Sequence, residues 1–85
     1  MAKEKKPFPC VEFGEYLRSI REQAKITQEQ LSEIAGFDRT YVSGVERGER
    51  NISLVNICRF ADALNTHPSQ LFEFYQTPDR EKESE

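Results

Sequence analysis

The sequence contains few of the residues from which catalytic and metal-binding sites are built. It has two cysteines, Cys10 and Cys58, and a single histidine, His67. Two cysteines this far apart provide neither a disulfide framework nor a zinc-binding spacing, and we expect both to be reduced thiols. His67 belongs to no arrangement of nucleophile, histidine and acid, and no glycine-rich phosphate loop is present. The sequence therefore predicts no metal, no cofactor and no enzymatic activity.

Long hydrophobic runs and an excess of positive charge are also missing. No apolar stretch approaches the roughly 20 residues of a membrane-spanning helix, and no signal-peptide pattern is present, so we expect a cytoplasmic protein without a membrane partner. The formal net charge of −3 argues against a protein that coats DNA without sequence preference. The charge is uneven, however, with four arginines against three acids between Asp38 and Arg59. A chain of 85 residues allows one domain with a small core.

Apolar residues recur at steps of three and four positions in most of the chain, which is the period of an α-helix. Five helices are predicted, at Val11–Ala24, Gln28–Ala35, Arg39–Arg47, Leu54–Leu64 and Pro68–Phe74. The fold class is therefore all-α. The side chains expected in the core are Phe13, Leu17, Ile20, Ala24, Leu31, Ile34, Ala35, Phe37, Val42, Val45, Leu54, Ile57, Phe60, Ala61 and Leu64.

The second and third predicted helices are joined by a tight turn. Thr27 stands before the second helix and Gln30 follows three residues later, which is the spacing of a capping box. Gly36 tolerates the left-handed conformation that ends a helix, Asp38 is placed to cap the third helix, and Gly48 ends it. Two helices joined by a short turn with glycine form a helix-turn-helix, whose second helix enters the major groove of DNA.

Three further polar residues have predicted backbone roles. Ser53 is expected to cap the helix that follows it, and Asn65 is expected to adopt a left-handed conformation at the end of that helix. The Ser32 hydroxyl is expected to bond back to the carbonyl four residues earlier.

The third predicted helix carries a polar stripe that neither a buried nor a merely solvated helix would need. Arg39 is the best candidate for base reading, because its guanidinium matches O6 and N7 of guanine and such a pair discriminates by about 1–3 kcal/mol. Thr40 and Ser43 can bond to bases or touch a thymine methyl group. Gly44 is expected to let the groove wall approach, and Tyr41 to bind phosphate or to pack.

Phosphate contacts are predicted around this stripe. Gln28 begins the second helix, where its amide and the free backbone N–H groups can bind an anion. The other candidates lie in or beside the loop after the third helix, where contacts fix register without reading sequence. They are Arg47, Arg50, Asn51 and Ser53.

These motifs together resemble the Cro/C1-type (XRE) helix-turn-helix family of phage and bacterial regulators, over roughly residues 11–75. The resemblance implies a compact, lambda-repressor-like domain of five helices with the helix-turn-helix at helices 2 and 3. It also implies a structural ion pair between Arg21 and Glu46. The matching residues are Thr27-Gln28, Leu31, Gly36, Asp38-Arg39-Thr40-Tyr41-Val42-Ser43, Glu46-Arg47-Gly48, Ser53, Leu54, Ile57, Ala61 and Leu64.

The run from Asp38 to Gly44 and the nearby Arg50-Asn51 resemble, more narrowly, the controller proteins of restriction–modification systems. That resemblance implies a transcriptional regulator that binds operator repeats beside its own gene. A phage- or plasmid-type repressor of other genes is the alternative within the same class. A different class, an antitoxin- or adaptor-type protein-interaction module, is disfavoured because a protein-binding face would more often carry apolar residues.

The expected partners are double-stranded DNA with an inverted repeat and a second copy of the chain, with RNA polymerase as a further candidate. No small-molecule ligand is expected, because there is no room for an effector domain. The aromatic C-terminal segment either closes the core of one chain or forms the interface of a twofold dimer, and we favour the dimer. Its residues are Leu71, Phe72, Phe74 and Tyr75.

The domain organisation follows from composition. Residues 1–10 are predicted to form a flexible basic arm, either solvated or in contact with DNA, with Lys3, Lys5 and Lys6. Residues 11–75 form the domain, and residues 76–85 form a disordered charged tail.

Overall fold

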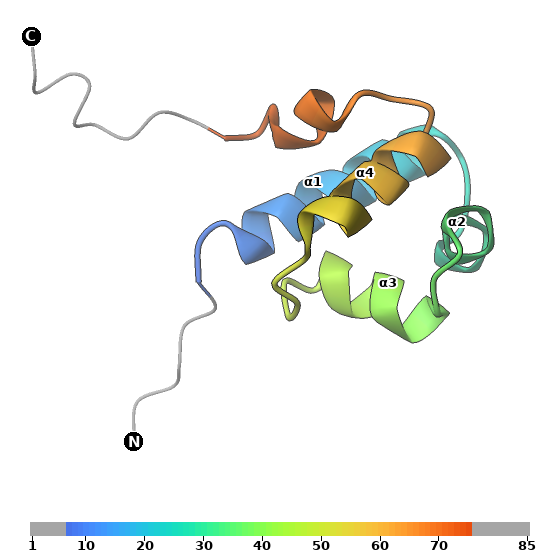
Figure 1. The fold of residues 1–85 in the computed structure, drawn as a ribbon, viewed down its shortest axis with the longest axis horizontal. Helices are drawn as coiled ribbons and strands as arrows, with labels where there is room; N and C mark the ends of the chain where they lie inside the picture. Colours follow the sequence, from blue (N-terminus) through green and yellow to red (C-terminus); the bar gives the residue numbers. More distant parts are fainter. Residues whose placement is uncertain (1–6, 76–85) are drawn as a thin grey trace, which may run out of the picture.

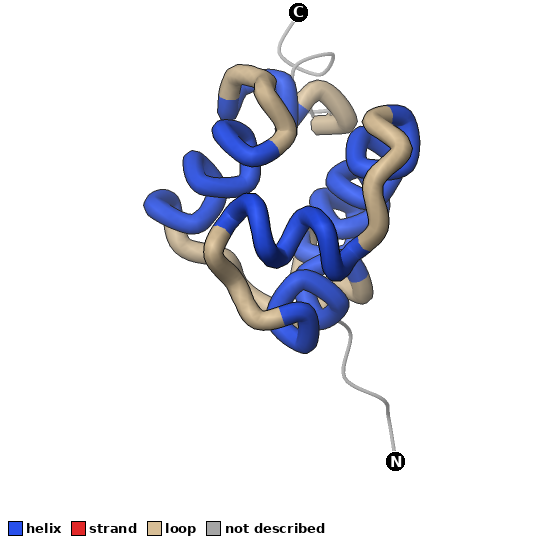
Figure 2. The backbone as a smooth tube through the Cα atoms, turned by 90° about the vertical axis from the view of Figure 1, so that its right-hand side faces the viewer, coloured by secondary structure: helices blue, strands red, loops and turns tan. Residues whose placement is uncertain are grey.

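The computed structural model describes residues 7–75, which form four α-helices and one 3₁₀-helix and contain no strand (Figures 1 and 2). The predicted tail and most of the predicted basic arm lie outside these residues. The prediction of an all-α fold is confirmed. The elements are α1 (Cys10–Gln23), α2 (Gln28–Ala35), α3 (Arg39–Glu46), α4 (Leu54–Ala63) and the 3₁₀-helix η1 (Pro68–Phe72).

The last element differs in kind from the predicted α-helix at Pro68–Phe74. Its backbone bonds span three residues, with the N–H of Gln70 donating to the carbonyl of His67 at 2.9 Å. The tighter 3₁₀ geometry is usual for short pieces of chain. The domain thus has four α-helices and a 3₁₀ turn where five helices were expected.

Local sequence signals set most helix ends. Thr27 and Gln30 form the predicted capping box, with bonds of 3.0 and 2.8 Å. Gly36 is left-handed with φ +79°, Asn65 has φ +56°, and Ser53 Oγ accepts from the backbone N–H of Asn56 at 3.1 Å. These five residues behave as predicted.

Two side-chain hydrogen bonds predicted from the sequence, those of Asp38 and Ser32, differ in the structure. Asp38 is the N-cap of α3, with extended backbone, but its side chain accepts no capping bond. Its carbonyl instead accepts from the N–H groups of Tyr41 and Val42, so the backbone alone starts the helix. Ser32 Oγ donates to the carbonyl of Glu29, three residues earlier instead of four.

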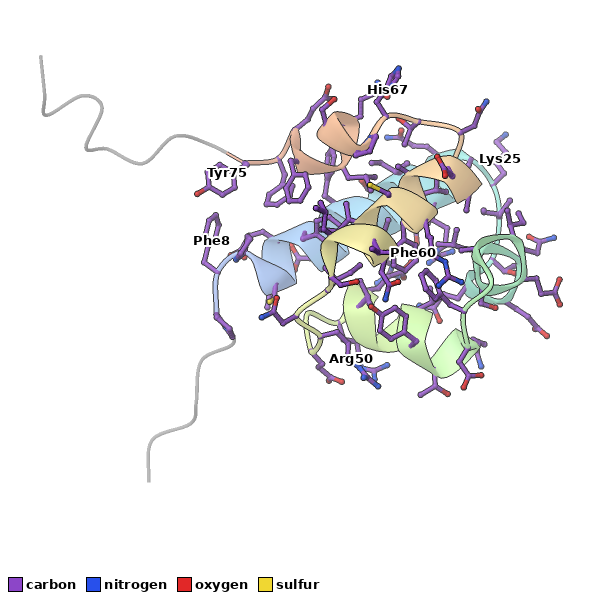
Figure 3. All side chains as sticks on the ribbon, in the orientation of Figure 1. Phe8, Lys25, Arg50, Phe60, His67 and Tyr75 are labelled. Atoms are coloured by element: carbon purple, nitrogen blue, oxygen red, sulfur yellow. The ribbon has the colours of Figure 1, made fainter. Side chains whose placement is uncertain are left out.

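The helices close around one core. α3 packs against α1 and α2, α4 packs against α2 and η1, and η1 packs against α1. Phe60 of α4 lies at the centre of this core, where its ring stacks on that of Tyr41 in α3 (Figure 3). The fully enclosed apolar side chains are Phe13, Leu17, Leu31, Val42, Val45, Phe60, Ala61 and Leu71.

Three residues predicted for the core are on the surface. Ala24 follows α1 as its C-cap and is exposed, while Ile34 is 59% and Leu54 is 76% exposed. The buried face of α2 is formed by Leu31, Ser32 and Ala35, and Ile34 lies about 100° around the helix from its centre. Leu54 is the first residue of α4, and the buried residues of that helix lie further along the chain.

Candidate nucleic-acid interface

α3 presents its polar residues outward and its valines inward. Arg39 and Thr40 are exposed and Ser43 is half-buried, whereas Val42 and Val45 are enclosed. The structure therefore brings the three predicted base-reading residues onto one accessible stripe. Because Arg39 and Thr40 form the first turn of the helix, this end of α3 is the one that can enter a groove.

The other end of α3 is fixed by a buried ion pair. Glu46 accepts from Arg21 Nε at 2.7 Å and from Arg21 Nη2 at 3.1 Å, and the two side chains are 3% and 9% exposed. Arg21 Nη1 also donates to the carbonyl of Ile26 at 2.8 Å. The ion pair implied by the resemblance is thus present, and it ties α3 to α1 and to the turn that precedes α2.

Gln28 adds α2 to this network. Its side-chain amide donates to Glu46 Oε1 at 2.9 Å, a contact that the sequence did not predict. The amide is therefore engaged inside the protein. The first four N–H groups of a helix have no partner within it, and the capping box satisfies those of Thr27 and Gln30. The N–H groups of Gln28 and Glu29 are left to bind an anion.

Arg47 follows α3 and is held by two side chains. It donates to both carboxylate oxygens of Glu49, at 3.1 and 3.0 Å, and to the hydroxyl of Ser43. The hydrogen bond and the charge of Glu49 raise the pKa of Arg47. Glu49 is an acid beside the predicted phosphate ligands, so phosphate binding by Arg47 would require it to exchange the Glu49 carboxylate for the phosphate.

Arg50 lies across α3. Its guanidinium carbon is 5.4 Å from the centre of the Tyr41 ring, and a Cβ built on Gly44 would meet Arg50 Nε at 3.2 Å. Gly44 is buried beneath this side chain, so it makes room for Arg50 and not for the groove wall that was predicted to approach it. Tyr41 packs on Phe37 at 5.0 Å, and its hydroxyl accepts from Asn56 at 3.0 Å.

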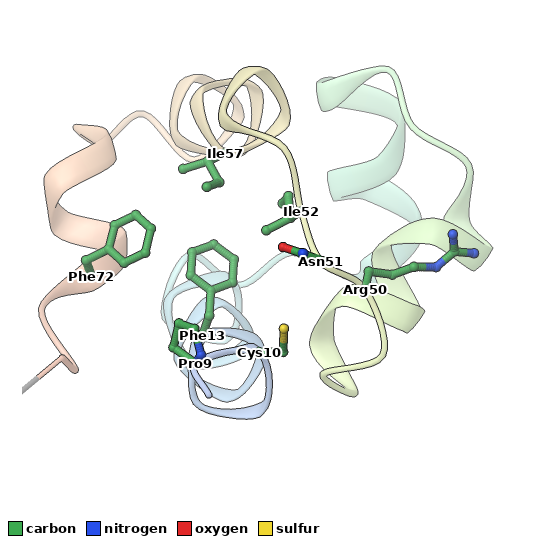
Figure 4. Close-up of a pocket in the computed structure, with 8 residues that line it drawn as sticks. All are labelled: Pro9, Cys10, Phe13, Arg50, Asn51, Ile52, Ile57 and Phe72. Atoms are coloured by element: carbon green, nitrogen blue, oxygen red, sulfur yellow. The ribbon is translucent and has the colours of Figure 1, made fainter. Parts of the chain in front are cut away.

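The loop after α3 borders a small apolar cavity of about 110 Å³ (Figure 4). The cavity lies between the start of α1, the 50–52 loop and η1, and Arg50 extends from its rim toward α3. Asn51 and Ser53, two predicted phosphate ligands, are exposed in this loop. The cavity is too small and apolar to change the interpretation of this face.

The C-terminal aromatic residues are used largely within one chain. Leu71 is 0% exposed, so it has no surface left for a second copy. Phe72 packs on Phe13 at 5.3 Å, and Phe74 packs on Tyr16 at 5.7 Å. Of the four predicted interface residues only Tyr75, at 48%, is strongly exposed.

A pair of exposed apolar side chains lies at the start of α4. Leu54 is 76% exposed and Val55 is 67% exposed. The periodicity of the sequence placed Leu54 in the core, and it gave no sign of a surface pair here.

The described residues contain neither a metal-binding cluster nor a membrane-spanning helix. Within 7–75, no cluster of histidine, cysteine and acidic side chains is arranged to hold a metal ion. None of the helices described is long and apolar enough to cross a membrane.

Comparison with known proteins agrees with this geometry. A helix-turn-helix family model matches residues 17–71. Control protein C.SmaI of Serratia marcescens is 47% identical over 58 residues, which are 68% of this chain and 69% of that protein. The crystal structure of the restriction–modification controller protein C.AhdI from Aeromonas hydrophila is 51% identical, covers 74% of this chain and 96% of its own, and superposes with a TM-score of 0.73.

The controller protein C.Esp1396I has been solved as a tetramer in complex with its natural 35-base-pair operator. That structure is 30% identical, covers 79% of this chain and 88% of its own, and has a TM-score of 0.73. Solved variants of C.Esp1396I change an arginine, a threonine and a tyrosine at consecutive positions, and Arg39-Thr40-Tyr41 is such a run here. The chain therefore belongs to the helix-turn-helix family and, within it, to the restriction–modification controller proteins.

Proposed function

We propose that the protein binds an inverted-repeat operator in double-stranded DNA as a twofold dimer, with α3 of each copy in the major groove. The observation that carries this proposal is the stripe of exposed Arg39 and Thr40 and half-buried Ser43, on a helix whose far end is fixed by the Arg21–Glu46 pair. A reading helix needs both features, since the readers must be accessible and the helix must hold one orientation.

The base contacts are assigned by side-chain chemistry. Arg39 offers a planar pair of donors to O6 and N7 of guanine, the commonest specific contact in the major groove. Thr40 and Ser43 offer hydroxyls to either kind of base edge. Tyr41 packs within the protein, which leaves only its half-buried edge for the DNA backbone.

The phosphate contacts frame this stripe on two sides. On one side are the free N–H groups of the first turn of α2, in Gln28 and Glu29. On the other side the loop after α3 supplies the remaining ligands, which fix the register of the protein on the duplex. They are Arg47, Arg50, Asn51 and Ser53.

The dimer is proposed to form through Leu54 and Val55. These side chains follow directly on the loop of proposed phosphate ligands, so an interface there would adjoin the proposed DNA contacts. The competing surface is formed by Phe8 and by Tyr75, which belongs to the interface predicted from the sequence; their rings are 5.1 Å apart.

Operator binding by a protein of this family acts on transcription. A regulator that binds its operator as a dimer responds to its own concentration, through assembly and occupancy. We propose regulation of restriction–modification genes in the cytoplasm, where the DNA of these bacterial relatives lies, with RNA polymerase as the candidate protein partner.

Selection of bound duplexes from a random library at near-physiological salt tests the proposal. The expected result is an inverted repeat whose half-sites lie about 10–10.5 base pairs apart, or a multiple of that distance. Failure to enrich any sequence would contradict operator recognition and favour a protein-binding role.

A further inference from the structure

Arg59, on α4, makes an unusual set of contacts with the end of α2. Its Nε and Nη2 atoms donate to the carbonyl of Ala35 at 3.2 and 2.9 Å. Nη2 also donates to the carbonyl of Gly36 at 2.8 Å. One guanidinium therefore binds two successive carbonyls, which belong to the last residue of α2 and to the first residue of the turn.

These carbonyls are a place where a cation is favourable. The last carbonyls of a helix have no partner within it and form the negative end of its dipole. The last turn of α2 contains no basic residue of its own. The cation comes instead from a residue 24 positions after Ala35 in the sequence.

The same side chain also covers the turn. The Arg59 guanidinium carbon lies 4.2 Å from the centre of the Phe37 ring, a cation–π contact. Phe37 is the middle of the turn between α2 and α3, and its ring packs on Phe60 at 4.8 Å and on Tyr41 of α3 at 5.0 Å. Phe37 is thus in contact both with Arg59 of α4 and with Tyr41 of α3.

We propose that Arg59 is a positioning residue for DNA reading: it holds the helix-turn-helix turn against α4 and so fixes the direction in which α3 leaves that turn. The proposal rests on the function proposed above. Glu46 fixes the far end of α3, whereas Arg59 fixes the end where Arg39 and Thr40 lie. A small rotation there moves both readers away from the base edges.

The test uses Arg59→Ala, the conservative Arg59→Lys and a control, Gln70→Ala. Gln70 Oε1 accepts from the backbone N–H of His67 at 3.0 Å, so the control removes a capping bond at η1, away from the turn. All variants are compared at equal fractions of folded protein. This keeps a general loss of stability separate from the effect on α3.

The first measurement is amide hydrogen exchange in the free protein. Arg59→Ala is expected to speed exchange of the α3 amides as well as those of Gly36 and Phe37, while Gln70→Ala leaves α3 unchanged. Faster exchange confined to the end of α2 would overturn the proposal, because Arg59 would then be only a cap. This measurement does not depend on DNA, so it stands even if no operator is found.

The second measurement is the ratio of affinities for the selected operator and for random duplex. Arg59→Ala is expected to lower this ratio roughly tenfold while the affinity for random duplex changes little. The ratio for Arg59→Lys is expected to lie between those of the wild type and Arg59→Ala. An equal loss of both affinities with a weaker salt dependence would overturn the proposal and make Arg59 a phosphate ligand. A wild-type protein with no operator preference would contradict the proposed function. The hydrogen-exchange result would then still show whether Arg59 holds the turn and α3.

Discussion

Glu46 joins α3 to both α1 and α2 in the candidate interface. Its carboxylate accepts three hydrogen bonds, two from Arg21 of α1 and one from Gln28 of α2. A buried ion pair must offset the desolvation of both charges, so its value lies more in fixing geometry than in net stability. Removing only one partner is costly, because the other charge is left buried and unpaired.

Glu46→Ala is expected to destabilise the protein by about 3–5 kcal/mol, since it leaves the Arg21 guanidinium buried without its carboxylate. Denaturant unfolding measures this loss. Glu22→Ala is the control, because Glu22 pairs with Arg18 at the surface of α1 and such pairs contribute about 0–1 kcal/mol. Equal, small losses in both variants would contradict the role of the buried pair.

Arg39→Ala is expected to cost about 1–3 kcal/mol of operator affinity, because it removes the bidentate contact to guanine, and to change random-duplex affinity much less. Arg18→Ala removes the same charge from α1, outside the proposed interface, and controls for net charge. Fluorescence anisotropy with both duplexes gives the two affinities. If the two affinities fall together in Arg39→Ala, Arg39 binds phosphate and does not read a base.

Two helices meet at the level of their backbones where α1 crosses α3. A Cβ built on Gly14 would lie 2.3 Å from the carbonyl oxygen of Val45 and 2.7 Å from that of Glu46. Both neighbours are backbone atoms, which cannot turn aside as a side chain can. Gly14 therefore sets the distance between α1 and α3, and with it the geometry of the Arg21–Glu46 pair.

Gly14→Ala is expected to destabilise the protein by about 1–3 kcal/mol or more, because α1 and α3 must separate. Thermal unfolding reports the change. The matched control is Gly44→Ala, whose added Cβ meets only the side chain of Arg50 and which gains helix propensity. Gly44→Ala should keep the stability but lower DNA affinity by displacing Arg50. A Gly14→Ala protein as stable as the wild type would show that the helices are not in close contact.

At the scale of the whole molecule, the proposed dimer needs an apolar surface that one chain leaves uncovered. One chain encloses Leu71 and half-buries Phe72 and Phe74, so most of the C-terminal aromatic segment closes the core of the monomer. Within residues 7–75, the large apolar side chains that remain exposed are Leu54 and Val55 at the start of α4, Ile34, and the neighbouring Phe8 and Tyr75. Of these, the start of α4 adjoins the proposed DNA backbone contacts.

The double variant Leu54→Ser/Val55→Ser is expected to sediment as a monomer and to lose operator affinity, because each buried leucine contributes about 1.5–3 kcal/mol and the twofold axis doubles the effect. Analytical ultracentrifugation measures the association. Ile34→Ser removes an exposed apolar side chain from α2 and serves as the control. If Tyr75→Ser dissociates the dimer and the double variant does not, the interface lies at the C-terminal segment.

The helices and their ends were largely predictable because they depend on local chemistry. The capping box at Thr27, the left-handed Gly36 and the cap at Ser53 each involve residues no more than four positions apart. The accessible stripe of Arg39, Thr40 and Ser43 was predictable for the same reason, since one helix carries it. The prediction that Ile34 and Leu54 lie in the core was wrong. Periodicity gives the apolar face of a helix but not how much of that face its neighbours cover.

The sequence by itself determined the helical segments, the turn between α2 and α3 and the outward position of the residues proposed to read bases, all of which follow from short-range backbone and side-chain preferences. Beyond the Arg21–Glu46 pair, which the family resemblance implied, only the tertiary structure decided how that turn and α3 are held. The Arg59 guanidinium on the carbonyls of α2 and the Gln28 amide on Glu46 join residues 18 to 24 positions apart in the chain. No local pattern marks such pairs, because they form only when the packing of the helices brings them within hydrogen-bonding distance.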